Sequence, residues 1–137
     1  QYFSAIAVNA VKELGTDGVS TFSFIKNIET AYKAADIIIS RAGAIAISEL
    51  CVIGKPVILI PSPNVAENHQ FKNAQSLVNK NAALLVKDSQ ANDKLVLKII
   101  SLKNDSQLMK ELRVNIKTME AKEASSIIAS HAMSLIK

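Results

Sequence analysis

The sequence predicts an α/β domain built on a Rossmann-like parallel sheet with helices on both faces. Two aliphatic runs, at residues 37–39 and 57–60, have the unbroken apolar character of central strands buried on both faces. Helical patterns lie between and after these runs, and strands that alternate with helices are typical of βαβ units. Each run also ends in a polar, turn-prone segment, where an open parallel sheet collects its ligands.

The elements are expected in a regular order. A first helical pattern is closed by Gly15 and Gly18, since glycine commonly follows a helix. Asn27 is suited to cap a short second helix, and Gly54 to end a later one. Strands are predicted at 19–24, 36–40, 56–60 and 82–86, and helices at 5–14, 27–34, 42–53, 67–80, 92–102, 105–120 and 123–136.

The length of 137 residues supports one domain, 1–137, and the apolar share of 49% predicts a globular chain. Four strands that start after a helix suggest a doubly wound sheet without its first strand or strands. We therefore expect the chain to be a fragment of a larger protein.

Composition excludes several classes of function. The net charge of +4 comes from scattered lysines, and aromatic residues make up 4% of the chain, so a nucleic-acid surface is not expected. The single cysteine, Cys51, leaves no disulfide framework, and two histidines without an acidic cluster indicate no metal site. Neither a membrane-spanning run nor a signal-peptide pattern is found, so an intracellular location is expected.

The segment Arg41-Ala42-Gly43-Ala44 follows the first aliphatic run and opens a helix. Free backbone N–H groups and the helix dipole favour an anion there, and Gly43 lets a phosphate approach the backbone closely. A tight turn also needs glycine, so a turn and a ligand site are both open interpretations. The sequence has no GxGxxG motif and gives no support to a dinucleotide site.

The segments at the two strand ends are expected to build one side of a nucleotide or nucleotide-sugar pocket, and three further polar side chains are candidates to line it. Glu49 is the only charge in its aliphatic helix, and an unpaired buried carboxylate is costly. It should reach solvent or a partner such as a ribose diol; an ordinary surface glutamate is the alternative. His69 and Gln70 lie in the first turn of the helix after the second run, where they can bond sugar hydroxyls or a diphosphate. The alternative for this pair is that they are ordinary polar residues at the amino terminus of a helix, without a ligand.

An ordered set of short motifs resembles the carboxyl-terminal domain of the MurG family, bacterial peptidoglycan N-acetylglucosaminyltransferases of glycosyltransferase family 28. The resemblance is specific over about 24–74 and looser through the final helices. The set is Phe24-Ile25, Ala35-Asp36, Ser40-Arg41-Ala42-Gly43-Ala44, Ser48-Glu49, Gly54-Lys55-Pro56, Pro61, Glu67-Asn68-His69-Gln70 and Asn73-Ala74.

The resemblance implies one half of a GT-B fold that binds the donor UDP-N-acetylglucosamine (UDP-GlcNAc). The whole enzyme would transfer GlcNAc to lipid I to form lipid II, with inversion at the anomeric carbon and without a metal or other cofactor. It would be peripheral on the cytoplasmic face of the bacterial inner membrane. The missing amino-terminal domain would hold lipid I and the proposed base, so no catalytic residue is assigned here and the chain alone should be inactive.

The resemblance also implies roles by position. Ile25 would meet the uracil through its backbone, with Phe24 beside it. The loop Arg41, Ala42, Gly43 and Ala44 would lie near the diphosphate, and Glu49 would hold the ribose. His69 and Gln70 would address the GlcNAc hydroxyls, although the family often has glutamine where His69 stands.

Other functions remain open on the sequence. One is a sister GT-B transferase of the glycolipid or dolichol-linked GlcNAc type. Another is a non-catalytic nucleotide-binding module that has kept the scaffold, since fold does not imply function. An epimerase acting on UDP-GlcNAc is more distant, because its acid and base residues are not evident.

Overall fold

A computed structural model of the chain describes residues 18–64, 68–119 and 133–135. The chain divides into two compact units, Gln1–Ala34 and Ala35–Lys137. The organisation as one domain over 1–137 stays a prediction. The helix expected at 5–14 lies outside the described residues, as does the helix at 123–136 apart from 133–135, which are helical.

In the first unit, the predicted short helix is confirmed as α2 (Ile28–Ala34). The Thr30 N–H donates to Asn27 Oδ1 at 3.1 Å, so Asn27 caps this helix as expected. Residues 19–24 form no strand, so that prediction was wrong. A strand persists only when its backbone pairs with another, and residues 18–34 contain no second strand.

The second unit contains a parallel sheet of three strands in the order β1-β2-β3. The strands are β1 (Ile38–Ser40), β2 (Val57–Leu59) and β3 (Leu84–Leu85). Ile38 lies opposite Val57 and Ile58 opposite Leu84, so the carboxyl ends of all three strands meet at one edge.

The central strand, β2, is buried on both faces as predicted, since all its residues are fully buried. On one face Ile58 joins a core cluster with Leu102 and Leu112. Its neighbours on the strand point to the other face. The same prediction was wrong for β1, where Ile39 is 44% exposed. Among the described residues β1 pairs with β2 alone, so it forms an edge of the sheet.

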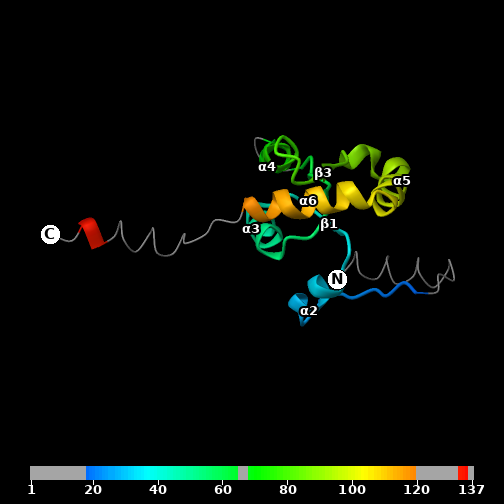
Figure 1. The fold of residues 1–137 in the computed structure, drawn as a ribbon, viewed down its shortest axis with the longest axis horizontal. Helices are drawn as coiled ribbons and strands as arrows, with labels where there is room; N and C mark the ends of the chain where they lie inside the picture. Colours follow the sequence, from blue (N-terminus) through cyan, green and yellow to red (C-terminus); the bar gives the residue numbers. More distant parts are fainter. Residues whose placement is uncertain (1–17, 65–67, 120–132, 136–137) are drawn as a thin grey trace. The chain divides into compact units, whose positions relative to one another are not determined.

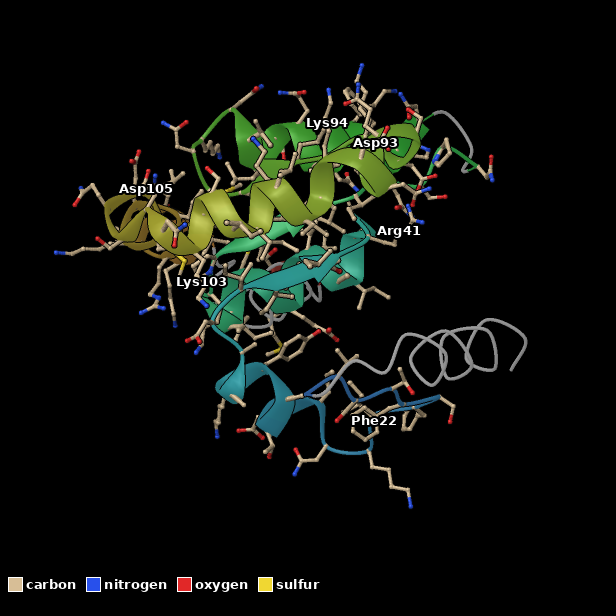
Figure 2. The ribbon with its side chains drawn as sticks, turned by 90° about the vertical axis from the view of Figure 1, so that its right-hand side faces the viewer. Phe22, Arg41, Asp93, Lys94, Lys103 and Asp105 are labelled. Atoms are coloured by element: carbon tan, nitrogen blue, oxygen red, sulfur yellow. The ribbon has the colours of Figure 1, made fainter. Side chains whose placement is uncertain are left out.

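Helices follow each strand (Figure 1). They are α3 (Ala44–Ile53), α4 (His69–Val78), the short 3₁₀ helix η2 (Asp88–Gln90), α5 (Ala91–Asn104) and α6 (Ser106–Thr118). Helix α6 packs against α3 and α5 (Figure 1). Figure 2 shows Arg41 where β1 ends, with the exposed Lys94 and Lys103 on α5. The α/β class with a parallel sheet is therefore confirmed, and the described residues contain three of the four predicted strands.

Two helix ends show why the sequence breaks where it does. Gly54 ends α3 in the left-handed region, at φ 66°, and its N–H donates to the Leu50 carbonyl oxygen at 3.0 Å. Glycine is favoured there because it has no Cβ to crowd the next carbonyl. At the start of α6, Asp105 accepts a hydrogen bond from the Leu108 N–H at 2.9 Å.

Candidate functional site

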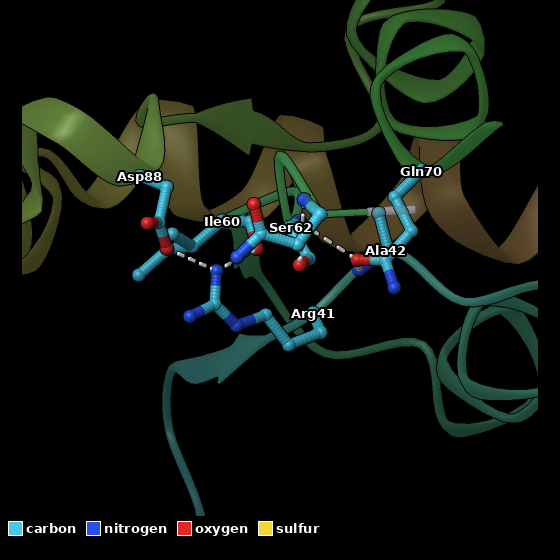
Figure 3. Close-up of polar contacts among 7 residues, drawn as sticks. Arg41, Ala42, Ile60, Ser62, Gln70 and Asp88 are labelled. Atoms are coloured by element: carbon cyan, nitrogen blue, oxygen red, sulfur yellow. Dashed lines mark hydrogen bonds and ion pairs between the residues drawn. The ribbon is translucent and has the colours of Figure 1, made fainter. Parts of the chain in front are cut away.

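The segments that follow the three strands lie together at the carboxyl edge of the sheet (Figure 3). They come from positions 41–43, 60–64 and 86–88 in the chain. This is the edge at which open parallel sheets bind ligands. The sequence-based expectation that the loops after the first two aliphatic runs lie side by side is confirmed.

Arg41 ties the three strand ends together. Its Nη1 donates to the Ile60 carbonyl oxygen at 3.2 Å and also forms an ion pair with Asp88 (Figure 3). The Arg41 side chain is 56% exposed, so the guanidinium group remains open to solvent. Sequence reasoning missed Asp88, although it is one of the polar residues that follow the third strand, which the same strand-end rule singles out.

Helix α4 holds the loop after β1 at a single residue, Ala42. The Ala42 N–H donates to Gln70 Oε1 at 3.3 Å, and its carbonyl oxygen accepts from Asn73 Nδ2 at 3.1 Å. Gln70 Oε1 also accepts from the Ser62 N–H at 2.9 Å, which joins the loop after β1 to the loop after β2 (Figure 3). Ala42 is fully buried, so these bonds satisfy polar groups that water does not reach.

The Gln70 side chain therefore serves the scaffold through its oxygen. Its Nε2 makes no hydrogen bond to any residue that the structure describes. That amide nitrogen is the group with which Gln70 could donate to a sugar hydroxyl. The expected contact with GlcNAc stays a prediction.

Gly43 precedes α3 with an extended backbone, φ −67° and ψ 149°. Any residue can adopt this conformation, so the backbone angle does not explain the glycine. A Cβ built at Gly43 would meet nothing within 4 Å. The loop thus offers open space beside the first N–H groups of α3, where helices leave donors without internal partners. Ala44, the first residue of α3, is exposed next to this space.

Glu49 lies on the outer face of α3, where its side chain is exposed. The neighbouring exposed residues of this face include Ile45 and Val52, which stand one helical turn away on each side. The expectation that this carboxylate avoids burial is confirmed. Its contact with a ribose stays a prediction.

His69 is exposed in the first turn of α4, and it is not without an interaction partner. Phe24 and Ile25 belong to the first unit, where both side chains are exposed. The roles expected for these three residues stay predictions.

A pocket of about 400 Å³ lies between the loops that follow β2 and β3. None of the residues singled out from the sequence as ligand contacts lines it, but Asp88 does. Asn68 lines it from the start of α4, with a left-handed φ of 57° that asparagine tolerates better than most residues. The lining residues are Pro61, Ser62, Pro63, Asn68, Phe71, Lys87, Asp88 and Ser89.

Within the described ranges, no group of three or more histidine, cysteine, aspartate or glutamate side chains could hold a metal ion. No helix within the same ranges has the length and apolar character needed to cross a membrane.

A parallel sheet whose loop after β1 is fixed at the carboxyl edge by hydrogen bonds from α4 is typical of a Rossmann-like domain. The chain belongs to the glycosyltransferase family 28 C-terminal domain, whose family model matches residues 4–129. The resemblance seen over about 24–74 is thereby confirmed and extended.

Curated relatives carry the name UDP-N-acetylglucosamine--N-acetylmuramyl-(pentapeptide) pyrophosphoryl-undecaprenol N-acetylglucosamine transferase. The protein from Flavobacterium psychrophilum is 46% identical over 123 residues, covering 90% of this chain and 34% of the relative. The protein from Bacteroides thetaiotaomicron is 47% identical over 129 residues, covering 94% of this chain and 34% of the relative. The chain thus spans about a third of the length of the curated relatives it matches.

A crystal structure of MurG from Acinetobacter baumannii matches the fold with a TM-score of 0.80 and 25% sequence identity. The match covers 93% of this chain and 38% of that one. The predicted relation to one half of a MurG-type enzyme is confirmed.

Proposed function

We propose that this chain is the donor-binding half of an inverting transferase that moves GlcNAc from UDP-GlcNAc to a lipid-linked muramoyl pentapeptide. The loop after β1 carries the proposal. It is fixed through both polar groups of Ala42, and it leaves open space at Gly43 beside the start of α3. Family membership and the names of the relatives support the choice of donor and acceptor.

The diphosphate of the donor is proposed to bind at the start of α3. Backbone N–H groups and the helix dipole favour negative charge there, and Arg41 adds a full positive charge nearby. Because these groups attract and partly neutralise the negative charge of the departing UDP, we propose that the site works without a metal ion. They stabilise the charge that develops on the β-phosphate oxygen as its bond to the sugar C1 breaks.

The remaining donor contacts are proposed from the family resemblance. Glu49 accepts hydrogen bonds from the ribose hydroxyls, and Gln70 Nε2 and His69 bond the GlcNAc hydroxyls. Ile25 meets the uracil through its backbone, with Phe24 beside it. Together these contacts hold the sugar C1 in place for the acceptor hydroxyl, which is catalysis by orientation.

The acceptor and its base are proposed to come from another part of the whole enzyme. The attacking C4 hydroxyl of lipid I forms the new bond to C1 and gives up its proton to that base, and UDP leaves. We propose that the enzyme works on the cytoplasmic face of the bacterial inner membrane as a peripheral protein, with no nucleic-acid partner. The chain alone should bind donor without transferring it.

The test is an NMR titration of the 137-residue chain with UDP-GlcNAc and, separately, with UDP-glucose. We expect shifts at Gly43, Glu49 and Gln70 with UDP-GlcNAc, weaker binding of UDP-glucose, and a loss of affinity in Glu49→Ala. The control Glu111→Ala removes an exposed glutamate of α6 and should leave binding unchanged. A folded chain that binds no uridine nucleotide at millimolar concentration would contradict the proposal and favour a non-catalytic module.

A further inference from the structure

Arg41 is held at its place by one of its three guanidinium nitrogens. Nη1 donates both to the Ile60 carbonyl oxygen and to Asp88 Oδ1 (Figure 3). The other two, Nε and Nη2, make no hydrogen bond to any residue within the described ranges.

The edge of the guanidinium group formed by Nε and Nη2 has a specific use. Two N–H groups on that edge point in parallel, and they match two oxygens of a phosphate or carboxylate. A free arginine side chain samples many rotamers, and a ligand that uses this edge must first order it. In this chain the bond to Ile60 and the ion pair with Asp88 have already ordered it.

Asp88 is the charged member of this arrangement. It opens η2 just after β3, 47 positions along the chain from Arg41, and its side chain is 36% exposed. Both bonds from Nη1 have a charged donor, but only the bond to Asp88 adds the attraction between two opposite charges. Asp88 therefore contributes more than the Ile60 carbonyl group to holding Arg41.

We propose that Asp88 is a positioning residue for donor binding: it holds Arg41 by Nη1 so that the Nε–Nη2 edge receives the diphosphate. This inference rests on the proposed function, because it takes the ligand to be a nucleoside diphosphate sugar. It also gives the loop after β3 a role in a site that the sequence placed only after the first two aliphatic runs.

Two effects of Asp88 on an anion oppose each other. Its negative charge repels the diphosphate across the guanidinium group, but Arg41 and Asp88 are both partly exposed to solvent. Two unit charges about 6 Å apart in water interact by about 0.7 kcal/mol, and salt screens part of this, so the repulsion changes affinity by about twofold. Ordering the arginine before binding is worth about three- to tenfold in affinity. We expect the ordering effect to be larger, so that loss of Asp88 weakens binding.

The first experiment observes the arginine side chains by NMR, which is direct because the sequence contains only Arg41 and Arg113. Arg113 lies exposed on α6 and serves as the internal reference. Held Nη1 protons should give resolved guanidinium signals for Arg41 and averaged signals for Arg113. In Asp88→Ala the Arg41 signals should become averaged too. Averaged Arg41 signals in the unchanged chain would overturn the proposal.

The second experiment compares the binding of UDP-GlcNAc and of uridine, which has no phosphate. In Asp88→Ala, UDP-GlcNAc should bind about two- to fivefold more weakly, which is the ordering effect reduced by the relieved repulsion, while uridine binds as before. Asp88→Glu should restore most of the affinity, because it keeps the carboxylate. The control Asp36→Ala removes an exposed acid at the opposite end of β1 and should change neither ligand's affinity.

The outcomes separate this inference from the proposed function. If the unchanged chain binds no uridine nucleotide, the proposed function fails, and the inference fails with it. If the unchanged chain binds UDP-GlcNAc and Asp88→Ala binds it equally well or more tightly, only the positioning role is refuted. Equal weakening of uridine and UDP-GlcNAc would show general structural damage and would also refute it.

Discussion

The Gln70 side chain offers a direct test of how the binding loops are fixed. Its Oε1 accepts one hydrogen bond from Ala42 and one from Ser62, which belong to loops after two different strands. Gln70→Ala removes both bonds at once. The loops would then lose the link that α4 provides between them.

The loss of unfolding free energy expected for Gln70→Ala follows from the surroundings of each backbone N–H donor. The Ala42 N–H is in a fully buried residue, and an unsatisfied buried donor costs about 1–3 kcal/mol. Its bond of 3.3 Å is long, which places the cost near the lower end. Ser62 is partly exposed, so water can replace its bond for about 0.5–1 kcal/mol. We expect a total loss of about 2 kcal/mol.

Urea unfolding measures this loss. For a small domain, a loss of about 2 kcal/mol lowers the midpoint by about 1–2 M urea. The matched control is Gln75→Ala on the same helix, which removes only an exposed hydrogen bond to Asn79. It should cost about 0.5 kcal/mol or less.

A second substitution separates the scaffold role from the ligand role. Gln70→Glu keeps an oxygen that can accept both backbone N–H groups, so the free energy of unfolding should stay within about 1 kcal/mol of the original. The added negative charge should nevertheless weaken UDP-GlcNAc binding by about tenfold. If Gln70→Ala were no more destabilising than Gln75→Ala, the claim that Gln70 fixes the two loops would be refuted.

Further substitutions test three local features. Gly54→Ala should destabilise the chain by about 1–2 kcal/mol, because φ is 66° and the new Cβ would lie 2.6 Å from the Lys117 side chain. In a Lys117→Ala background the steric part of that loss should vanish. If urea unfolding showed the same loss for Gly54→Ala with and without Lys117→Ala, the backbone angle would be the whole cause. Asp105→Ala should cost about 1 kcal/mol and Asp105→Asn much less, because the side chain caps α6; equal losses in thermal unfolding would contradict the capping role. On α2, the hydrogen bond and the charge of Lys33 lower the pKa of Glu29, so the pair stabilises the helix above the ordinary pKa of the carboxyl group and is lost as the pH falls through the lowered one. Lys33→Ala should return the Glu29 pKa toward its ordinary value in an NMR titration, and an unchanged pKa would exclude the ion pair as the cause.

The elements of the sheet could be predicted because their signals are local. The run at 57–60 is apolar without interruption, and β2 is the fully buried central strand that this pattern indicates. The run at 37–39 has the same character, yet Ile39 is exposed because β1 lies at the edge of the described sheet. Hydrophobicity predicts a strand, but the number of its neighbours in the sheet decides its burial.

The prediction of a strand at 19–24 shows the same limit. The segment has β-branched and aromatic residues, but propensity alone does not supply a partner strand. Capping residues were more reliable, since Asn27 and Gly54 act within one turn of their own helices.

By itself, the sequence predicted the order and approximate ends of the strands and the long helices that the structure describes in the second unit, and the loop at 41–44 as the candidate anion site. These features depend on residues a few positions apart. Tertiary structure decided what holds that loop: Gln70 reaches Ala42 across 28 positions, and Asp88 reaches Arg41 across 47. No periodic pattern records such pairs, because their proximity arises only when parallel strands bring their carboxyl ends to one edge of the sheet.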